Sequence, residues 1–226
     1  SEWPDDLLTR LMQARDEETG APMAATLLRD ESITMFFAGH ETTARTMAAA
    51  WYALAANPAV ADRLHAELDA ALGDRDPTLE DLPRLPYTLQ VVKEVLRLYP
   101  PAPFYVRDAV EDNTLAGYPI PAGTAVMLSP YFTHRHRAFW EDPLAFDPDR
   151  WTADREAAQH PYAYHPFAAG QRICLGNNFS LLEMHLLLAV LARRFAPRLV
   201  AGYTPRWVMR GVLAPANGLP MVIAAR

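Results

Sequence analysis

The sequence has little cysteine and little lysine, with one residue of each among 226. A single Cys excludes an internal disulfide, and we therefore expect a reducing, cytoplasmic compartment, as in a soluble bacterial protein. The remaining basic residues are Arg, and 21 Lys+Arg stand against 27 Asp+Glu for a formal net charge of -6. Because this mild acidity comes without a polybasic block, we expect no nucleic acid partner and no attraction to anionic lipid.

Long apolar runs are missing as well. The longest run, Met47 to Ala56, has about half of the roughly 20 residues that a membrane helix needs, and the first residues contain no apolar segment typical of a signal peptide. We therefore expect no membrane association. Hydrophobic residues make up 50% of the chain, which excludes a disordered protein and is sufficient for a sizeable core.

Helical periodicity dominates the chain. Apolar spacing and Pro or Gly breaks predict helices over residues 5–15, 24–56, 59–72, 86–99 and 178–195. Short strand-like runs at residues 114–115, 118–120 and 125–128 predict a small sheet region, and the last twenty residues predict a terminal hairpin. The fold class is therefore mainly α with a minor β region, and we expect the long, apolar helix 24–56 to be buried.

The only cysteine lies in the stretch Phe167-Ala-Ala-Gly170-Gln-Arg172-Ile-Cys174-Leu-Gly176, just before a predicted helix. A helix N-terminus and a nearby Arg both favour a thiolate, and glycines on either side let backbone amides approach the sulfur. A lone Cys can also be a small buried hydrophobe in a turn. The five fixed positions, however, occur by chance on the order of once in 10,000 sequences of this length or more rarely.

With these residues the chain resembles the cytochrome P450 superfamily, whose haem-ligand signature has the same form. The resemblance implies a haem b cofactor with Cys174 as the axial thiolate ligand of the iron, which would favour O–O bond cleavage. Phe167 would pack over the ligand loop, and Arg172 would face a haem propionate. The resemblance assigns further cofactor contacts to Arg107, which follows a Pro-rich segment, and to Gly170, Gly176, Ala38 and Gly39.

A second segment of the same family resemblance is Ala38-Gly39-His40-Glu41-Thr42-Thr43 in the long helix. The small residues leave room beside the helix for a diatomic ligand, and an adjacent acid and alcohol can relay protons. By themselves, the threonines could equally bond to helix carbonyls, and the acid could be a neutral core residue. The resemblance implies that Glu41 and Thr42 are the catalytic pair for oxygen activation.

A third segment contains Glu94 and Arg97, whose i, i+3 spacing puts them on one helix face. Such a pair is usually a solvated ion pair. The family pairs these residues with a later Arg, and Arg150 matches that position. We therefore expect a buried structural triad of Glu94, Arg97 and Arg150 that holds the core behind the haem.

The matching segments cover residues 1–226 but only the C-terminal half of the family fold. This half would comprise an oxygen-groove helix (24–56), a Glu-x-x-Arg helix (86–99), the Cys-ligand loop (167–176) and a final helix (178–195). The chain begins with Ser1 as though in the middle of a domain, so we expect a fragment whose ability to hold haem alone is open. The apolar face of the long helix should then stay exposed.

The resemblance implies a haem-thiolate monooxygenase that inserts one atom of dioxygen into a small apolar organic substrate, with electrons from a separate ferredoxin or flavin reductase. Substrate contacts would come from Phe36, Phe37, residues 102–106 and residues 208–212. Alternatives are a peroxide-driven haem-thiolate enzyme, a haem-free inactive remnant that serves as an interaction module, and a Cys nucleophile with a His base. The pairs His134/His136 and His160/His165 lack further ligands, so we expect surface or loop positions and no zinc site.

Overall fold

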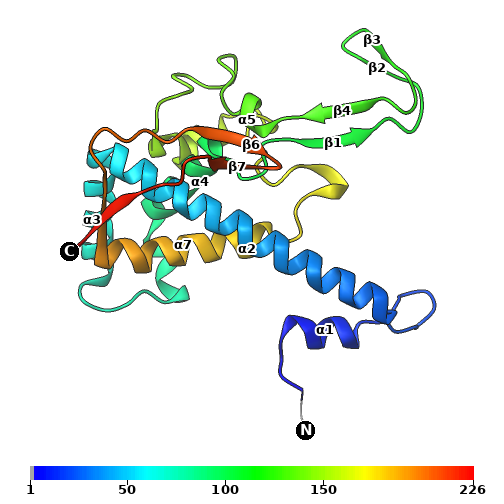
Figure 1. Cartoon of the computed structure of the whole chain (residues 1–226), viewed down its shortest axis with the longest axis horizontal. Helices are drawn as coiled ribbons and strands as arrows, with labels where there is room; N and C mark the ends of the chain where they lie inside the picture. The colour runs from blue at the N-terminus through cyan, green and yellow to red at the C-terminus, as the bar shows by residue number, and fades with distance from the viewer. Residues whose placement is uncertain (1–2) are drawn as a thin grey trace. The chain divides into compact units, whose positions relative to one another are not determined.

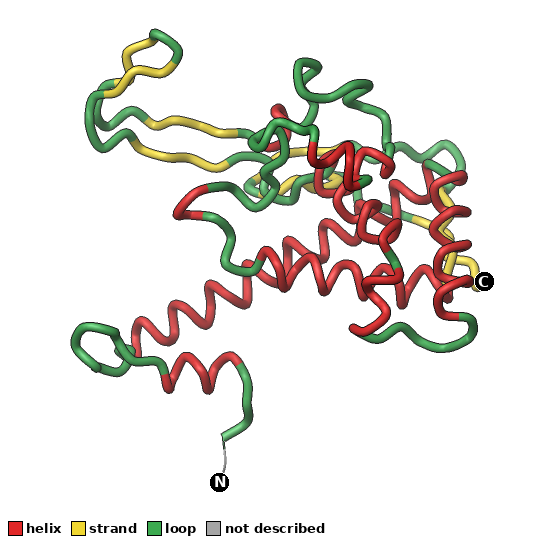
Figure 2. The backbone as a smooth tube through the Cα atoms, turned by 180° about the vertical axis from the view of Figure 1, so that it is seen from behind, coloured by secondary structure: helices red, strands yellow, loops and turns green. Residues whose placement is uncertain are grey.

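The computed structural model describes residues 3–226, in which helices dominate and strands are short (Figures 1 and 2). The α-helices are α1 Leu7–Gln13, α2 Ala25–Ala56, α3 Pro58–Leu72, α4 Pro86–Leu98, α5 Pro130–Thr133, α6 Ala153–Ala157 and α7 Asn177–Arg194. Short 3-10 helices are η1 Leu79–Arg84, η2 Pro148–Trp151 and η3 Gly170–Arg172. The predicted fold class, mainly α with a minor β region, is confirmed, and the long helices match within one or two residues at each end.

The chain divides into two compact units, Ser1–Glu41 and Thr42–Arg226. The first unit contains α1 and the beginning of α2. Helix α1 is shorter than the predicted 5–15 because Asp6 caps it: its carboxylate accepts a hydrogen bond from the Thr9 N–H at 2.9 Å. The second unit contains the rest of α2 and all later elements, and it holds the Cys174 loop.

Helices α3, α4 and α7 pack against one another and build the main core of the second unit. On α4, Val91, Val95 and Leu98 recur at intervals of three or four residues and are buried, as expected for an amphipathic helix. Leu188 of α7 and Leu64 of α3 belong to the same cluster. The core therefore fixes α4, which carries the charged pair, and α7, which follows the Cys174 loop.

The expected burial of the long helix holds only for its second part. Ala49, Ala53 and Leu54 of α2 are buried, whereas Phe36 and Phe37 are 67% and 65% exposed. The reason is composition: small alanines allow close packing in the later turns, and the earlier turns mix polar and apolar residues all round. The first part of the helix therefore leaves large apolar side chains exposed, as we expected for this helix.

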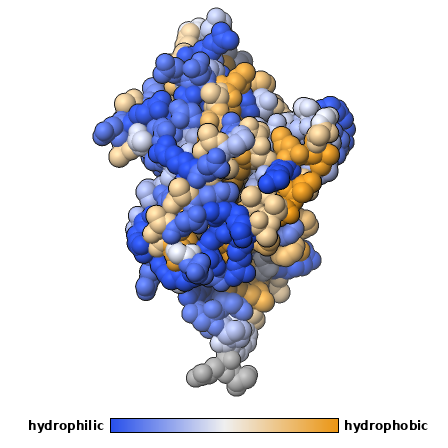
Figure 3. Space-filling view, turned by 90° about the vertical axis from the view of Figure 1, so that its left-hand side faces the viewer, coloured by the Kyte–Doolittle hydropathy of each residue, from blue (hydrophilic) through white to orange (hydrophobic). Residues whose placement is uncertain are grey.

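A second apolar surface adjoins the later turns of α2. An open hollow of about 420 Å³ is lined by Ala48, Trp51, Leu191, Phe195, Leu219, Met221 and Ile223. The space-filling view of the side that carries the C-terminus shows hydrophobic surface lying among hydrophilic surface (Figure 3). Among the helices of residues 3–226, none is long and apolar enough to cross a membrane.

Within residues 3–226 the strands form four two-stranded antiparallel sheets. Strand β1 Tyr105–Asp108 pairs with β4 Ala125–Leu128. The chain between these two strands contains β2 Asn113–Leu115 and β3 Tyr118–Ile120, which pair with each other. Near the end, β5 Phe195–Leu199 pairs with β8 Met221–Ala225, and β6 Trp207–Arg210 pairs with β7 Val212–Pro215. The predicted small sheet region is present, with β1 as a strand that the pattern did not single out.

The prediction of one terminal hairpin is wrong for the last strand. The hairpin is β6–β7, which turns at Gly211 with a φ of 78°. Strand β8 instead pairs with β5, with Phe195 opposite Ala225. The prediction failed because Pro197 made the segment after α7 look unlike a strand, and a partner distant in sequence leaves no local signal. Phe195, predicted as the end of the helix, begins this strand.

Candidate functional site

The Cys174 loop is held by its own backbone. The Cys174 N–H donates to the Phe167 carbonyl at 2.9 Å, and the Ile173 N–H donates to the Gly170 carbonyl at 3.1 Å. The chain enters the left-handed region at Ala168, with a φ of 62°, and at Gly170, with a φ of 71°. Glycine adopts this region without steric cost, which gives a physical reason for Gly at position 170. These turns fold the loop back so that residues 167 and 174 meet.

The Cys174 side chain is exposed at the N-terminal end of α7. The partial positive charge of this 18-residue helix lies at that end. Arg172, two residues earlier, is also exposed, and within residues 3–226 it makes no ion pair. The alternative of a small buried hydrophobe in a turn is therefore wrong for Cys174.

Exposed apolar residues flank Cys174 in the sequence. Ile173, Leu175 and Phe179 are all exposed, Leu175 to 87%. Phe167 is half-buried and packs against the main core. The surface around Cys174 thus combines one soft sulfur donor with apolar neighbours and a cation, which is the chemistry that a flat apolar macrocycle with an iron atom and carboxylate substituents requires.

Arg107 lies on β1, on the same side of the strand as Tyr105, and its guanidinium stands 5.0 Å from the centre of the Tyr105 ring. The Tyr105 hydroxyl is 3.4 Å from Nδ1 of His165, and the two rings meet edge to face. Arg107 also makes no ion pair within the part of the chain that the structure describes. Strand β1 therefore brings a second unpaired cation beside the segment that leads into the Cys174 loop.

The predicted catalytic pair lies on one helix. Glu41 and Thr42 are consecutive, half-buried residues of α2, and the Thr42 carbonyl accepts a hydrogen bond from Oγ1 of Thr46 at 2.9 Å. Ala38 and Gly39 are exposed one turn earlier, and a Cβ on Gly39 would meet no atom within 4 Å. Since Glu41 ends the first unit and Thr42 begins the second, their approach to Cys174 stays a prediction.

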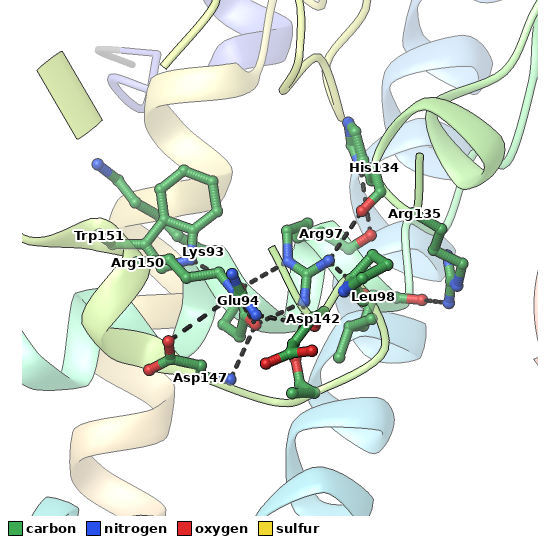
Figure 4. A network of polar contacts seen from close by, with 12 residues as sticks. Lys93, Glu94, Arg97, Leu98, His134, Arg135, Asp142, Asp147, Arg150 and Trp151 are labelled. Atoms are coloured by element: carbon green, nitrogen blue, oxygen red, sulfur yellow. Dashed lines mark hydrogen bonds and ion pairs between the residues drawn. The ribbon is translucent and has the colours of Figure 1, made fainter. Parts of the chain in front are cut away.

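The three residues of the predicted structural triad do meet. Glu94 and Arg97 are fully buried, and they form two parallel hydrogen bonds of 2.7 and 2.8 Å (Figure 4). Nε of Arg150 forms an ion pair with Oε1 of Glu94 at 3.5 Å, without hydrogen-bond geometry. The rigid fork of Arg97 suits a carboxylate, which explains how this charged pair is accommodated in the core.

The triad also holds the segment before the Cys174 loop. Arg97 donates from Nη1 to the carbonyls of His134 and Pro143, at 2.8 and 2.7 Å, and from Nη2 to Ala145 at 2.8 Å. Glu94 accepts from the Trp151 indole at 3.0 Å and from the Asp147 N–H at 2.9 Å. Because every charged atom of the pair has partners, helix α4 fixes the path of residues 134–151.

His134 has a role that the sequence did not indicate. We expected a surface or loop position, and His134 does lie in the turn after α5, but it is fully buried, with hydrogen-bond partners on both ring nitrogens. Burial and the neighbouring His165 lower the pKa of His134 to about 3. The only sequence pattern at this position is His134-x-His136, which we interpreted as a possible metal site and not as a buried hydrogen-bonding residue. Within residues 3–226 no three His, Cys, Asp or Glu side chains gather as a metal site, and the expectation of no zinc site stays a prediction.

The segments expected to contact substrate are apolar and partly adjacent. Phe36 and Phe37 meet edge to face with ring centres 6.0 Å apart, and Phe36 also stacks on His40. The Leu213 N–H donates to the Pro101 carbonyl at 3.0 Å, which brings the β6–β7 hairpin beside the Pro-rich segment before β1. This bond joins the residue just after segment 208–212 to the residue just before segment 102–106.

Comparison with known proteins gives a consistent family match. A family model described as Cytochrome P450 matches residues 1–218. Cyclooctatin synthase of Streptomyces melanosporofaciens is 40% identical over 217 residues, which cover 95% of this chain and 47% of that protein. Pentalenene oxygenase of Streptomyces avermitilis is 38% identical over 187 residues, 83% of this chain and 41% of that protein.

The match extends to solved structures. The crystal structure of the cytochrome P450DA heme domain superimposes with a TM-score of 0.91 at 34% identity, over 98% of this chain and 49% of that one. The chain thus spans about half the length of the relatives and structures that it matches.

Proposed function

Because this chain belongs to the cytochrome P450 family, we propose that it carries the haem-thiolate centre of a monooxygenase and represents the C-terminal half of the family fold. The observation that carries the proposal is the exposed Cys174, held by its own loop at the N-terminal end of α7. A thiolate there is accessible to iron, and the backbone around it is fixed by hydrogen bonds.

The residues present fit a haem b group. Cys174 would be the axial ligand, the exposed apolar side chains around it would cover the ring, and Arg172 and Arg107 would pair with the two propionates. A Cβ at Gly170 or at Gly176 would meet no atom within 4 Å, so both glycines would leave the surface of the loop open to the ring. When bound, the haem would supply dioxygen activation, so that one oxygen atom enters the substrate and the other leaves as water.

The other site residues would act on protons and on position. Glu41 and Thr42, an acid and an alcohol on adjacent positions of α2, would deliver protons, and Ala38 and Gly39 would leave room beside the helix. Glu94, Arg97 and Arg150 would have a structural role only, because they are buried behind the loop with their charges paired.

Substrate and partner classes follow as part of the proposal. The exposed Phe36 and Phe37, and the largely apolar segments 102–106 and 208–212, favour a small apolar organic substrate. Electrons would come from a separate ferredoxin or flavin reductase. The relatives named above include an oxygenase, which favours oxygen insertion over a peroxide-driven reaction. A cytoplasmic location is proposed on the single cysteine.

The test is the reduced carbon monoxide difference spectrum of the purified chain after haem is added. We expect a Soret band shifted far to the red, as thiolate ligation produces, and its loss in Cys174→Ala. Asn178→Ala, an exposed change four residues further on, should keep the band. A thiolate-type band in Cys174→Ala, or a band typical of histidine ligation in the unaltered chain, contradicts the proposal. No band at all would favour the haem-free remnant.

The Cys–His nucleophile has no support in the geometry. Within residues 3–226 no hydrogen bond joins the Cys174 side chain to a histidine. The nearest histidine in sequence, His165, has its ring beside Tyr105 and His134. No histidine is placed to take a proton from the Cys174 thiol, which disfavours this function.

A further inference from the structure

A buried histidine joins helix α4 to the beginning of the Cys174 loop. His134 lies after α5 with no exposed surface, and its ring stacks on Tyr164 at 5.2 Å between centres. Its backbone carbonyl accepts from Nη1 of Arg97 at 2.8 Å, and its Nδ1 lies 3.2 Å from the Arg97 carbonyl. On the other side of the ring, Nε2 lies 2.9 Å from the backbone N–H of His165.

These two contacts fix the tautomer of the ring. A carbonyl only accepts hydrogen bonds, so Nδ1 must carry the proton that is donated to Arg97. A backbone N–H only donates, so Nε2 must be bare and accept from His165. In a protonated imidazolium, the Nε2–H donor would face the His165 N–H donor. In a neutral ring with its proton on Nε2, the bare Nδ1 would face the Arg97 carbonyl, and both are acceptors. Only the neutral Nδ1–H form satisfies both sides.

From His165 the contacts continue to the thiol through the backbone. The His165 carbonyl accepts from the Ala168 N–H at 3.1 Å, which closes the turn where Ala168 is left-handed. Phe167, inside this turn, accepts from the Cys174 N–H at 2.9 Å. The amide of His165 is therefore a point at which the loop is hydrogen-bonded to the buried core, in addition to the packing of Phe167, and His134 is the side chain that accepts this bond.

We infer that His134 is a positioning residue that fastens the Cys174 loop to helix α4 through the His165 amide. The ring connects two rigid groups, the Glu94–Arg97 pair and the turn around Phe167, without touching Cys174. The inference rests on the proposed function in one respect, since Cys174 is taken as the ligand whose position matters. The hydrogen-bond connection itself does not depend on haem.

Two variants separate the two hydrogen bonds. His134→Asn places an amide where Nδ1 was and can keep the bond to Arg97, and His134→Gln places one where Nε2 was and can keep the bond to His165. Each variant loses one of two buried hydrogen bonds, so each is the control for the other. We expect the hydrogen exchange of the His165 and Cys174 amides to rise about tenfold or more in His134→Asn and to stay within about threefold in His134→Gln.

The outcomes are distinct. The inference is overturned if the Cys174 amide exchanges equally fast in the two variants when both unfold at the same urea concentration. That result would show that His134 contributes only to overall stability. The unaltered chain supplies a second test: nitrogen NMR of the ring should show a protonated Nδ1 and a bare Nε2 at neutral pH, and the reverse assignment also overturns it. With haem added, the thiolate-type band should be stronger in His134→Gln than in His134→Asn. If the unaltered chain shows no such band, the proposed function fails while the exchange comparison still decides the role of His134.

Discussion

At the scale of single residues, the Cys174 loop contains a strained alanine. Ala168 has a φ of 62°, whereas its neighbour Ala169 is extended at a φ of -155°. An alanine in the left-handed region costs roughly 1–2 kcal/mol, and glycine removes that cost but adds about 0.4–1 kcal/mol of entropy to the unfolded chain. The loop therefore keeps its turn because the surrounding hydrogen bonds hold it there.

We predict that Ala168→Gly leaves the free energy of unfolding unchanged or raises it by up to about 1.6 kcal/mol, while Ala169→Gly lowers it by about 0.4–1 kcal/mol. Both variants lose one methyl group from a half-buried position, so their difference isolates the backbone term. Urea unfolding measures it. Equal destabilisation by the two glycines would show that Ala168 is not strained.

Residue types and spacing predicted much of the candidate site because its chemistry is local. The five fixed positions from Phe167 to Gly176 pointed to the loop, and the Glu94–Arg97 spacing pointed to a pair on one helix face. His134 was missed because its role depends on two backbone groups, at residues 97 and 165, that no local pattern brings together. When a side chain forms hydrogen bonds to backbone groups that are distant in sequence, no local pattern of residue types indicates it.

At the scale of elements, one helix caps the next. Helix α4 begins at Pro86, and the preceding residue, Leu85, offers no side-chain cap. The carboxylate of Glu67 on α3 accepts instead from the backbone N–H groups of Tyr87 and Thr88, at 2.7 and 2.8 Å, and from the Thr88 hydroxyl at 2.7 Å. A negative charge at a helix N-terminus also interacts favourably with the helix dipole. Glu67 thus sets the packing of α3 on the helix that carries Glu94 and Arg97.

We predict that Glu67→Ala lowers the free energy of unfolding by about 2–3 kcal/mol, because it leaves two backbone N–H groups and the Thr88 hydroxyl at the start of α4 without their acceptor. Asp62→Asn, an exposed change on the same helix, should stay within about 0.5 kcal/mol. Thermal or urea unfolding of both variants checks this. If Glu67→Ala lowers the free energy of unfolding no more than Asp62→Asn does, water accepts the hydrogen bonds at the start of α4 equally well and the Glu67 cap does not stabilise the fold.

Helices were easier to predict than sheets for a related reason. The spacing of apolar residues on α4 and α7 carries its own periodicity, so their ends came within one or two residues. The partner of β8 is β5, on the far side of the β6–β7 hairpin in sequence, and nothing in Met221–Ala225 specifies that partner. The second part of α2 is buried because alanines fit against the core, which composition alone did not separate from the exposed first part.

At the scale of the whole molecule, its buried histidines make stability depend on pH. His134 is neutral in the fold, with its pKa lowered to about 3 by burial and by nearby His165, Arg97 and Arg135. Burial also lowers the pKa of His185, whose Nε2 lies 2.9 Å from the Leu85 carbonyl, and of His165. In the unfolded chain each would titrate near pH 6.5. Below that pH the unfolded state binds protons that the folded state does not, so stability is lost as the pH falls.

We therefore predict that the free energy of unfolding is level from pH 8 to 7 and falls between pH 6 and 5, with His134 contributing about 1 kcal/mol per pH unit. Carboxylates with lowered pKa values contribute little to the change in the free energy of unfolding in this window, because they titrate at lower pH. Asp76 is an example, since Arg194 and Arg193 lower its pKa to about 2. His134→Gln cannot titrate and should reduce the slope by that share, whatever it does to stability at pH 8. The measurement is urea unfolding at half-unit pH steps for both proteins. Parallel curves for the two would mean that His134 takes up its proton inside the fold, which the donor at His165 and the fully buried ring argue against.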